Sequence, residues 1–386
     1  MMTTDQIGVS LFVDDDVNKW AKEQYVQSLQ EIEMSSIPGA CLLRQLGTTN
    51  GQVFKYDSET NTVCVERFTL VWNVVRDRIS NLMEETTADP LYAFIKPEPH
   101  KVEKILEGRL RLIAGVSGID SFVDRILFRE LVKSMTNRLG RTPIAVGWTP
   151  VTGAQAFYSY LGHHDKWLSM DKSHWDWSVH PWLLDAVKRV LKNFVPMRPR
   201  WWSILVDRRF EALFNEPVWE FQDGTQIRQR EPGIMKSGCY LTIWINSISQ
   251  LIIHNYITVI NNIPPYPIWA LGDDTIQHLP DEYVSDYKDA LVDLGYKVKC
   301  VESAIPEFCG FHILRYAHVP AYNHKHSFLL RHLTWNKEDA ISTLRSYQLL
   351  YCNEKPILAK IRELARSRNL PQAIFKDEFM AMIQNQ

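Results

Sequence analysis

Two acidic residues, Asp273 and Asp274, stand side by side within the segment YPIWALGDDTIQHL. The apolar runs on either side predict two short strands joined at Gly272, so a hairpin turn would present both carboxylates. Carboxylate oxygens are hard ligands that suit Mg²⁺. Gly-Asp-Asp is also ordinary turn composition, and for an isolated tripeptide this simpler interpretation is favoured. The chemistry therefore depends on which other residues accompany the turn.

A further carboxylate, Asp171, ends a short apolar strand predicted at residues 168–172, and Asp176 follows at the entrance to the next helix. Helix capping is the alternative role for Asp176. A carboxylate at one strand end, facing a neighbouring turn with two more, is the arrangement that a two-metal site requires. The sequence therefore predicts that Asp171 lies close to the hairpin turn.

Polar residues recur at four- and five-residue steps in a third segment, at Ser237, Gly238, Thr242 and Asn246. This spacing predicts a helix that begins near Gly238 and carries polar side chains on its early turns. Buried hydroxyls with protein partners are the alternative explanation.

The surrounding pattern predicts the elements that position these residues. Helical spacing of apolar residues follows Pro181 through residue 195, and a second helix covers 281–295 with Gly295 as its stop. The uncharged stretch 241–260 has the length of a membrane span, but its Asn, Ser, Gln and His residues favour a helix buried in protein. A strand at 296–301 completes an α+β pattern, with helices on one face of an antiparallel sheet.

Composition sets broad limits on the class of protein. The chain has 386 residues, of which 45% are hydrophobic and 23% charged, which is typical of a globular chain and excludes a disordered or collagenous one. A formal net charge of −2 gives no overall basic signal, so any nucleic-acid surface must be local. Six cysteines without a C-x-x-C pair argue against a zinc ribbon and a disulfide framework. The N-terminal segment, with three consecutive aspartates, does not resemble a secretory signal.

The order D-x4-D, then SG-x3-T-x3-NS, then GDD resembles motifs A, B and C of viral RNA-dependent RNA polymerases. The variant DKSHWDWS with a later EFCGF is similar to the sobemovirus-like (solemovirid) group. The resemblance implies a right-handed palm, fingers and thumb fold. The implied lobes are fingers and N-terminal region 1–165 with motif F at 94–113, palm 166–196 with motif A, a fingers insertion 197–232, palm 233–315 with motifs B to E, and thumb 316–386.

The resemblance also implies roles for the acidic and basic residues. Asp171, Asp273 and Asp274 would be catalytic and would bind two Mg²⁺ ions, with Mn²⁺ as a substitute. The cations of motif F would meet the triphosphate: Lys96, Lys101, Arg109 and Arg111. An ordinary solvated helix is the alternative for this segment, because three glutamates balance its cations.

A second set of residues would bind the substrate: Asp176, Ser237, Gly238, Thr242 and Asn246. Among them, the side chains of Asp176, Asn246, Ser237 and Thr242 would select ribose. Hydrogen bonds to the ribose 2′-hydroxyl would leave unpaired polar groups when deoxyribose enters, so ribonucleotides are expected.

Two further motifs complete the resemblance. In motif D, either Lys297 or Lys299 would be the general acid for pyrophosphate, and the choice between them stays open. The segment 308–310 matches motif E, which supports the primer end, with a core strand as the alternative.

The implied activity is template-directed RNA synthesis for a positive-strand RNA virus. Its expected partners are an RNA template, the primer or product duplex, and ribonucleoside triphosphates. A genome-linked protein primer and other viral replication proteins are further candidates, and the location would be the host cytoplasm at replication complexes. The alternatives are a non-catalytic RNA-binding scaffold or a reverse transcriptase, which usually carries an aromatic residue where Asp176 stands.

Overall fold

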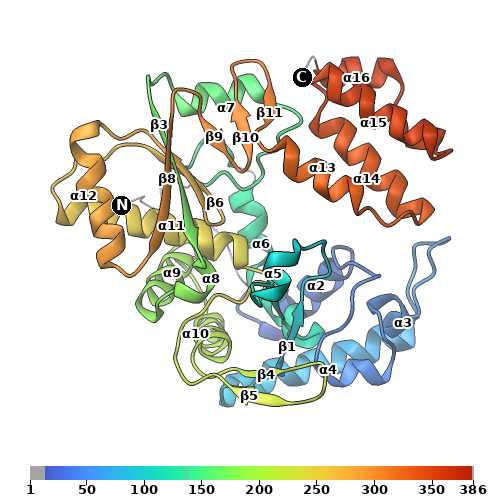
Figure 1. Cartoon of the computed structure of the whole chain (residues 1–386). Helices are drawn as coiled ribbons and strands as arrows, with labels where there is room; N and C mark the ends of the chain where they lie inside the picture. The colour runs from blue at the N-terminus through green and yellow to red at the C-terminus, as the bar shows by residue number, and fades with distance from the viewer. Residues whose placement is uncertain (1–13, 137, 385–386) are drawn as a thin grey trace. The chain divides into compact units, whose positions relative to one another are not determined.

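The computed structural model describes residues 14–136 and 138–384 of the chain (Figure 1). These residues form two units. The first takes in the described residues up to Arg138 together with His174–Asn255, and the second takes in Leu139–Ser173 together with the described residues from Tyr256 onward. The division falls inside helix α11 (Thr242–Ile260).

The first unit packs helices around a four-stranded sheet of order β2-β1-β4-β5, in which β1 and β4 run parallel and the other pairs antiparallel. The strands are β1 (Leu91–Ile95), β2 (Leu112–Gly115), β4 (Val218–Glu220) and β5 (Gln226–Arg228). The helices are α2 (Val17–Leu29), η1 (Leu42–Gln45), α3 (Asn50–Phe54), α4 (Val65–Glu84), α5 (Val102–Leu106), α6 (Gly118–Thr136), α8 (Trp175–Ser178), α9 (Pro181–Asn193) and α10 (Arg200–Phe214).

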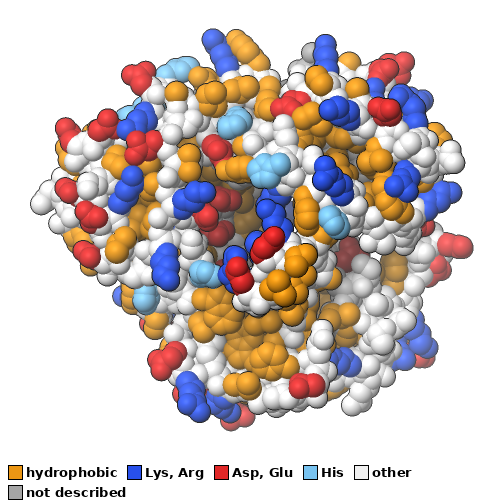
Figure 2. Space-filling view, viewed as in Figure 1, with side chains coloured by type: hydrophobic (Ala, Val, Ile, Leu, Met, Phe, Trp, Pro, Cys, Tyr) orange, Lys and Arg blue, Asp and Glu red, His pale blue; other side chains and the backbone are white. Residues whose placement is uncertain are grey.

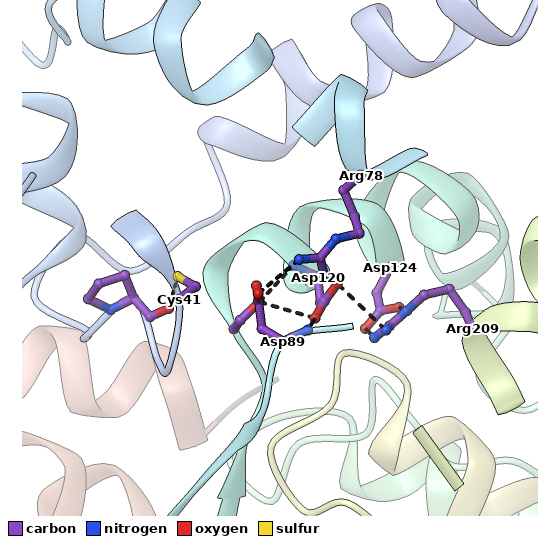
Figure 3. A network of polar contacts seen from close by, with 8 residues as sticks. Cys41, Arg78, Asp89, Asp120, Asp124 and Arg209 are labelled. Carbon is purple, nitrogen blue, oxygen red and sulfur yellow. Dashed lines mark hydrogen bonds and ion pairs between the residues drawn. The ribbon is translucent and has the colours of Figure 1, made fainter. Parts of the chain in front are cut away.

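A buried network of charged side chains joins α4, α6 and α10 in the first unit (Figure 3). Arg78 pairs with Asp89 at 2.8 Å and with Asp120. Arg209 makes a bidentate contact with Asp124, at 2.7 and 3.0 Å. Burial lowers the pKa of Arg209, but the Asp124 and Asp120 carboxylates together raise it by more than burial lowers it. The pKa therefore lies above its ordinary value, and the guanidinium stays charged.

The second unit is built on the antiparallel sheet β6-β7-β3-β8, which carries the acidic residues. A smaller antiparallel sheet has the order β11-β10-β9. The strands are β3 (Trp167–Ser173), β6 (Ile268–Leu271), β7 (Asp274–Gln277), β8 (Lys297–Ser303), β9 (Glu307–Phe308), β10 (Phe311–Ile313) and β11 (His318–Pro320). The helices are α7 (Ala154–Leu161), α12 (Asp281–Asp293), α13 (Asn323–Arg331), α14 (Lys337–Leu350), α15 (Lys355–Ser367), η2 (Pro371–Ala373) and α16 (Asp377–Gln384).

Apolar clusters hold these elements of the second unit together. Trp167 of β3 and Ile276 of β7 pack with Phe157 of α7 and with Phe308 and Phe311 of the smaller sheet. A separate cluster includes Leu344 of α14 and Ile361 of α15 and joins these two helices. The acidic sheet and the C-terminal helices thus have distinct cores.

Most of the predicted elements are confirmed. Helix α9 begins at Pro181, the hairpin turns at Gly272, α12 is followed by Gly295 with a φ of +88°, and β8 occupies the predicted strand. The predicted start of the motif B helix was wrong, because α11 begins at Thr242 and the residues before it form turns. The reason is that Gly238 forms a bridge with Gly115 of β2, which takes it out of the helix.

Helix α11 covers the uncharged stretch, as predicted. In the described part of the chain, every helix is too short or too polar to cross a bilayer.

Candidate active site

The three motif A and motif C carboxylates lie at one end of the β6-β7-β3-β8 sheet. Strand β3 pairs with β7 up to Met170 and Thr275, and Asp171 and Asp274 are the next residues on the two strands, close enough for the charge of Asp171 to act on Asp274. Directly opposed residues in an antiparallel pair have Cβ atoms about 5 Å apart. The structure therefore brings together two of the predicted carboxylates on adjacent strands, as the sequence predicts.

Asp273 is held in the two-residue turn between β6 and β7. Leu271 pairs with Asp274, which leaves Gly272 and Asp273 as the loop. Gly272 has a φ of +65°, a left-handed conformation that costs glycine little. A Cβ there would meet no atom within 4 Å, so the requirement for glycine is conformational.

The surroundings of Asp274 change its pKa. Desolvation by the surrounding protein, followed by the negative charges of Asp273 and Asp171, raises the pKa of Asp274 to about 6. Asp274 stands at the start of β7 with an exposed side chain, so a cation from solvent can reach it. The site therefore concentrates negative charge that a cation would stabilise.

Lys172, which the sequence did not single out, is buried on the opposite face of β3 from Asp171. Burial lowers its pKa to about 8, while Asp273, Asp171 and Asp274 act in the opposite direction. Only its position next to Asp171 in the sequence could have drawn attention to it.

The donor types at this site fit a divalent cation. Carboxylate oxygens prefer hard ions such as Mg²⁺ and Mn²⁺. As the side chains stand, no group of three or more His, Cys, Asp or Glu residues among the described residues is gathered closely enough to hold a metal ion.

The two motif D lysines differ in their distance along the sheet from Asp171. Strand β8 pairs with β3 so that Lys299 lies opposite Asp171 and Lys297 lies opposite Ser173. Both lysines are exposed. Asp171 is thus flanked by Asp274 on one side and by Lys299 on the other.

Motif E supplies groups beside Asp274. The thiol of Cys309 lies near the Asp274 carboxylate and lowers the pKa of Asp274, against the larger effect of burial, and Cys309 has a left-handed φ of +50°. Tyr322 donates a hydrogen bond to Glu307, and this bond, followed by burial, raises the pKa of Tyr322 to about 12. The segment EFCGF predicted motif E, but no pattern in the sequence pointed to Tyr322.

Asp176 and Asn246 belong to the first unit and are linked there through Trp175. The indole Nε1 of Trp175 donates to Asn246 Oδ1 at 2.8 Å, and Asn246 is buried. The backbone carbonyl of Asp176 accepts from Met235 N at 2.7 Å. The part of motif A around Asp176 and the motif B segment are therefore fixed together within this unit.

Ser237 and Gly238 meet strand β2. Ala114 N donates to Ser237 Oγ at 3.2 Å, and Gly238 N donates to Ala114 O at 3.1 Å. A Cβ at Gly238 would stand 2.4 Å from that same oxygen, so the close approach requires glycine. Thr242 Oγ1 donates within its own segment, to the carbonyls of Lys236 and Cys239, each at 2.8 Å.

The motif F cations lie between β1 and β2 and make surface ion pairs. Lys96 and Arg111 share Glu98, at 2.9 and 3.6 Å, and Arg109 pairs with Glu107. Exposed ion pairs contribute roughly 0–1 kcal/mol, so these cations can exchange a carboxylate for a phosphate at little cost.

The fourth predicted motif F cation, Lys101, precedes α5 and is exposed.

Basic side chains are interspersed with acidic and hydrophobic ones over the face seen in Figure 2. On α15, Leu358 and Ile361 face the core, whereas Lys360 and Arg366 are exposed.

Similar proteins were found among known replication proteins. The chain is 31% identical over 282 residues to the replicase polyprotein P2AB of Southern bean mosaic virus (isolate Bean/United States/Arkansas), covering 70% of this chain and 28% of that protein. It is 27% identical to the RNA-directed RNA polymerase of Mushroom bacilliform virus (isolate Australia/AUS LF-1), covering 67% of this chain and 66% of that one. The chain thus spans less than a third of the length of the replicase polyprotein.

The structure is similar to that of the Sicinivirus 3Dpol RNA dependent RNA polymerase, with a TM-score of 0.67 and 16% sequence identity, covering 99% of this chain and 88% of that one. This likeness confirms the predicted fold class. The family model described as viral RNA-dependent RNA polymerase matches residues 9–353. The resemblance predicted from the motifs is therefore confirmed, and the chain belongs to the viral RNA-dependent RNA polymerase family.

Proposed function

We propose that this chain catalyses template-directed RNA synthesis from ribonucleoside triphosphates and so replicates the genome of a positive-strand RNA virus. The strongest support is the pairing of β3 with β7, which places Asp171 and Asp274 at the same end of two neighbouring strands, beside the turn that holds Asp273. Family membership over residues 9–353 supports the same reaction.

The three aspartates are the proposed ligands of the divalent cations, with two Mg²⁺ ions as the expected set and Mn²⁺ as a substitute. When bound, such cations would stabilise the attacking and leaving oxygens of an in-line phosphoryl transfer. The raised pKa of Asp274 supports this assignment, because burial and then the charges of Asp273 and Asp171 disfavour its ionised form, which a bound cation would stabilise.

The lysines and arginines of the chain supply positive charge to the triphosphate. Lys299 lies opposite Asp171, which favours it over Lys297 as the proton donor to pyrophosphate. The motif F cations would bind the phosphate oxygens after leaving their surface ion pairs: Lys96, Lys101, Arg109 and Arg111.

Ribonucleotide selection is assigned to the motif A and motif B residues. The contact from Trp175 to Asn246 fixes the segment that carries Asp176. Ser237, Gly238 and Thr242 are held at the start of α11 by their own backbone and side-chain contacts. These contacts support a rigid set of polar groups around a ribose.

The proposed macromolecular partners are the RNA template and the primer or product duplex. The exposed cations of α15 support contact with a duplex backbone. A genome-linked protein primer and other viral replication proteins are included as partners on the family resemblance alone. A location in the host cytoplasm, at replication complexes, agrees with six cysteines that are all free.

Primer extension tests the proposal. The chain is incubated with a primed RNA template, Mg²⁺ and labelled ribonucleotides, and it is compared with Asp273→Ala and with Asp293→Ala, an exposed carboxylate on α12. The unaltered chain and Asp293→Ala should extend the primer. The extension rate of Asp273→Ala should be lower by at least about a hundredfold, the scale expected for one charge-stabilising group. Equal extension by both variants would overturn the assignment.

The scaffold and reverse transcriptase alternatives are less well supported. All three carboxylates are intact, and Asp176 stands where a reverse transcriptase usually carries an aromatic residue. Extension that uses deoxyribonucleotides as well as ribonucleotides would favour the reverse transcriptase.

A further inference from the structure

Lys236, which directly precedes Ser237, is completely buried, with 0% of its surface exposed. A buried ammonium group is costly unless each of its donors has an acceptor. Its Nζ donates to Gln229 Oε1 at 3.0 Å, to the carbonyl of Gly233 at 3.0 Å and to the carbonyl of Ile234 at 2.6 Å. All three donors of the ammonium are therefore used, each on a neutral oxygen.

Aromatic rings complete the cage around this ammonium. Nζ lies 5.4 Å from the ring centre of Phe214 and 5.5 Å from that of Trp219. Trp219 Nε1 also donates to Gln229 Oε1, at 3.3 Å. Burial lowers the pKa of Lys236 to about 7. The position of the side chain is thus set by directional contacts from α10 and from the β4-β5 hairpin.

The backbone that Lys236 binds has an unusual conformation. Gly233 has a φ of +109° and Ile234 a φ of +58°, which a β-branched residue rarely adopts. Ile234 N donates to Val179 O at 3.1 Å, and Met235 N donates to Asp176 O at 2.7 Å. The ammonium therefore binds carbonyls of the same short segment, residues 233–235, whose backbone N–H groups hold the Asp176 segment.

The other side of Lys236 leads into motif B. Its backbone carbonyl accepts from Thr242 Oγ1 at 2.8 Å and from Cys239 N at 3.0 Å. The next residue, Ser237, is bound to Ala114 of β2. Within the first unit, the side chain and the backbone carbonyl of Lys236 thus connect the Asp176 segment, the start of α11 and, through Ser237, strand β2.

We propose that Lys236 is a positioning residue for ribose selection, which holds residues 233–238 so that Asp176, Ser237 and Thr242 keep their relative places. This inference rests on the proposed function and deepens it. Because Lys236 is buried, it acts through these groups. Its loss should change which sugar is accepted and the KM for the nucleotide more than it changes kcat.

Single-nucleotide extension with a ribonucleotide and the matching deoxyribonucleotide tests the inference. Lys236→Met keeps the length of the side chain and removes its donors. The ratio of the two kcat/KM values should fall by about tenfold, the scale of one hydrogen bond, with kcat for the ribonucleotide changing by less than about threefold. Trp202→Phe is the control, because it loses a buried hydrogen bond to Leu127 O away from this loop.

Ile234→Gly provides a rescue, because glycine adopts a φ of +58° without strain. Added to Lys236→Met, it should restore part of the ribose preference. If thermal unfolding shows that Lys236→Met does not fold, Lys236→Gln, which keeps an N–H donor, takes its place and should show a smaller loss of preference.

An unchanged ratio and KM in the folded Lys236 variant would overturn the inference, and so would an equal change in Trp202→Phe. In either case an unaltered chain that extends with ribose preference would leave the proposed function standing. If the unaltered chain extended no primer, the proposed function would fail and the inference with it.

Discussion

The position of Lys299 opposite Asp171 leads to a prediction at the scale of single residues. Lys299→Met should lower the single-turnover rate of incorporation by about a hundredfold, since general acids typically contribute 10²–10⁴-fold. Lys297→Met is the matched control, because Lys297 is also exposed on β8 but lies opposite Ser173. A larger loss in the Lys297 variant would reverse the assignment.

His318 gives a pH-dependent prediction. It is buried beside Trp148 and Phe157, and burial lowers its pKa to about 4, partly offset by a contact with the Pro150 backbone. The unfolded chain takes up a proton near pH 6.5, so the free energy of unfolding should fall as the pH drops from about 6.5 to about 4. The loss from this residue amounts to at most about 3 kcal/mol.

Urea unfolding across this pH range measures the effect. His318→Leu should reduce the dependence of the free energy of unfolding on pH. His324→Leu, a change at an exposed histidine on α13, should leave that dependence unchanged. An unaltered slope in His318→Leu would show that other groups cause the pH dependence.

At this scale, the sequence allowed Asp171, Asp273 and Asp274 to be predicted because their order and spacing along the chain are distinctive. It did not reveal Lys236 or Lys172, because the burial of a lysine depends on partners that the local pattern does not specify. It also left Lys297 and Lys299 unresolved, since their difference lies in strand register.

Among the elements, α6 and α10 are joined by the buried pair of Asp124 and Arg209 (Figure 3). Arg209→Met should lower the free energy of unfolding by about 3–5 kcal/mol, because it leaves a carboxylate buried without its partner. Urea unfolding measures this loss. Adding Asp124→Leu should recover most of the stability, and a double variant as unstable as the single one would contradict the explanation.

Helix α15 carries a prediction about RNA binding. Lys360→Glu with Arg366→Glu should weaken binding of duplex RNA and reduce the slope of log Kd against log salt by about two, one for each lost phosphate contact. Fluorescence anisotropy at several salt concentrations measures both effects.

The matched control reverses two exposed cations of the first unit, Arg76→Glu with Lys133→Glu. An equal effect of the two double variants would mean that general charge, and not α15, determines the binding.

Elements could be predicted where a local signal marks their ends. Pro181 begins α9, Gly295 follows α12, and Gly272 forms the hairpin turn. The start of α11 could not be predicted, because it depends on the pairing of Gly238 with Gly115, which is distant in the sequence. Tertiary contacts decided that boundary.

For the molecule as a whole, the match to the family over residues 9–353 and the likeness to a solved viral polymerase agree with the order of the motifs. The acidic sheet lies within the second unit, and the motif B and motif F residues lie within the first. The sequence-based lobe boundaries remain predictions. Composition gave no help with function, because a net charge of −2 carries no signal of nucleic-acid binding.

Incorporation of one nucleotide opposite a defined template base is the most direct test of the central claim. With Mg²⁺, the unaltered chain should add the complementary ribonucleotide at each of the four template bases, and Asp273→Ala should add none of them at a comparable rate. Addition that ignores the template base, or unchanged addition by Asp273→Ala, would contradict template-directed synthesis at these carboxylates.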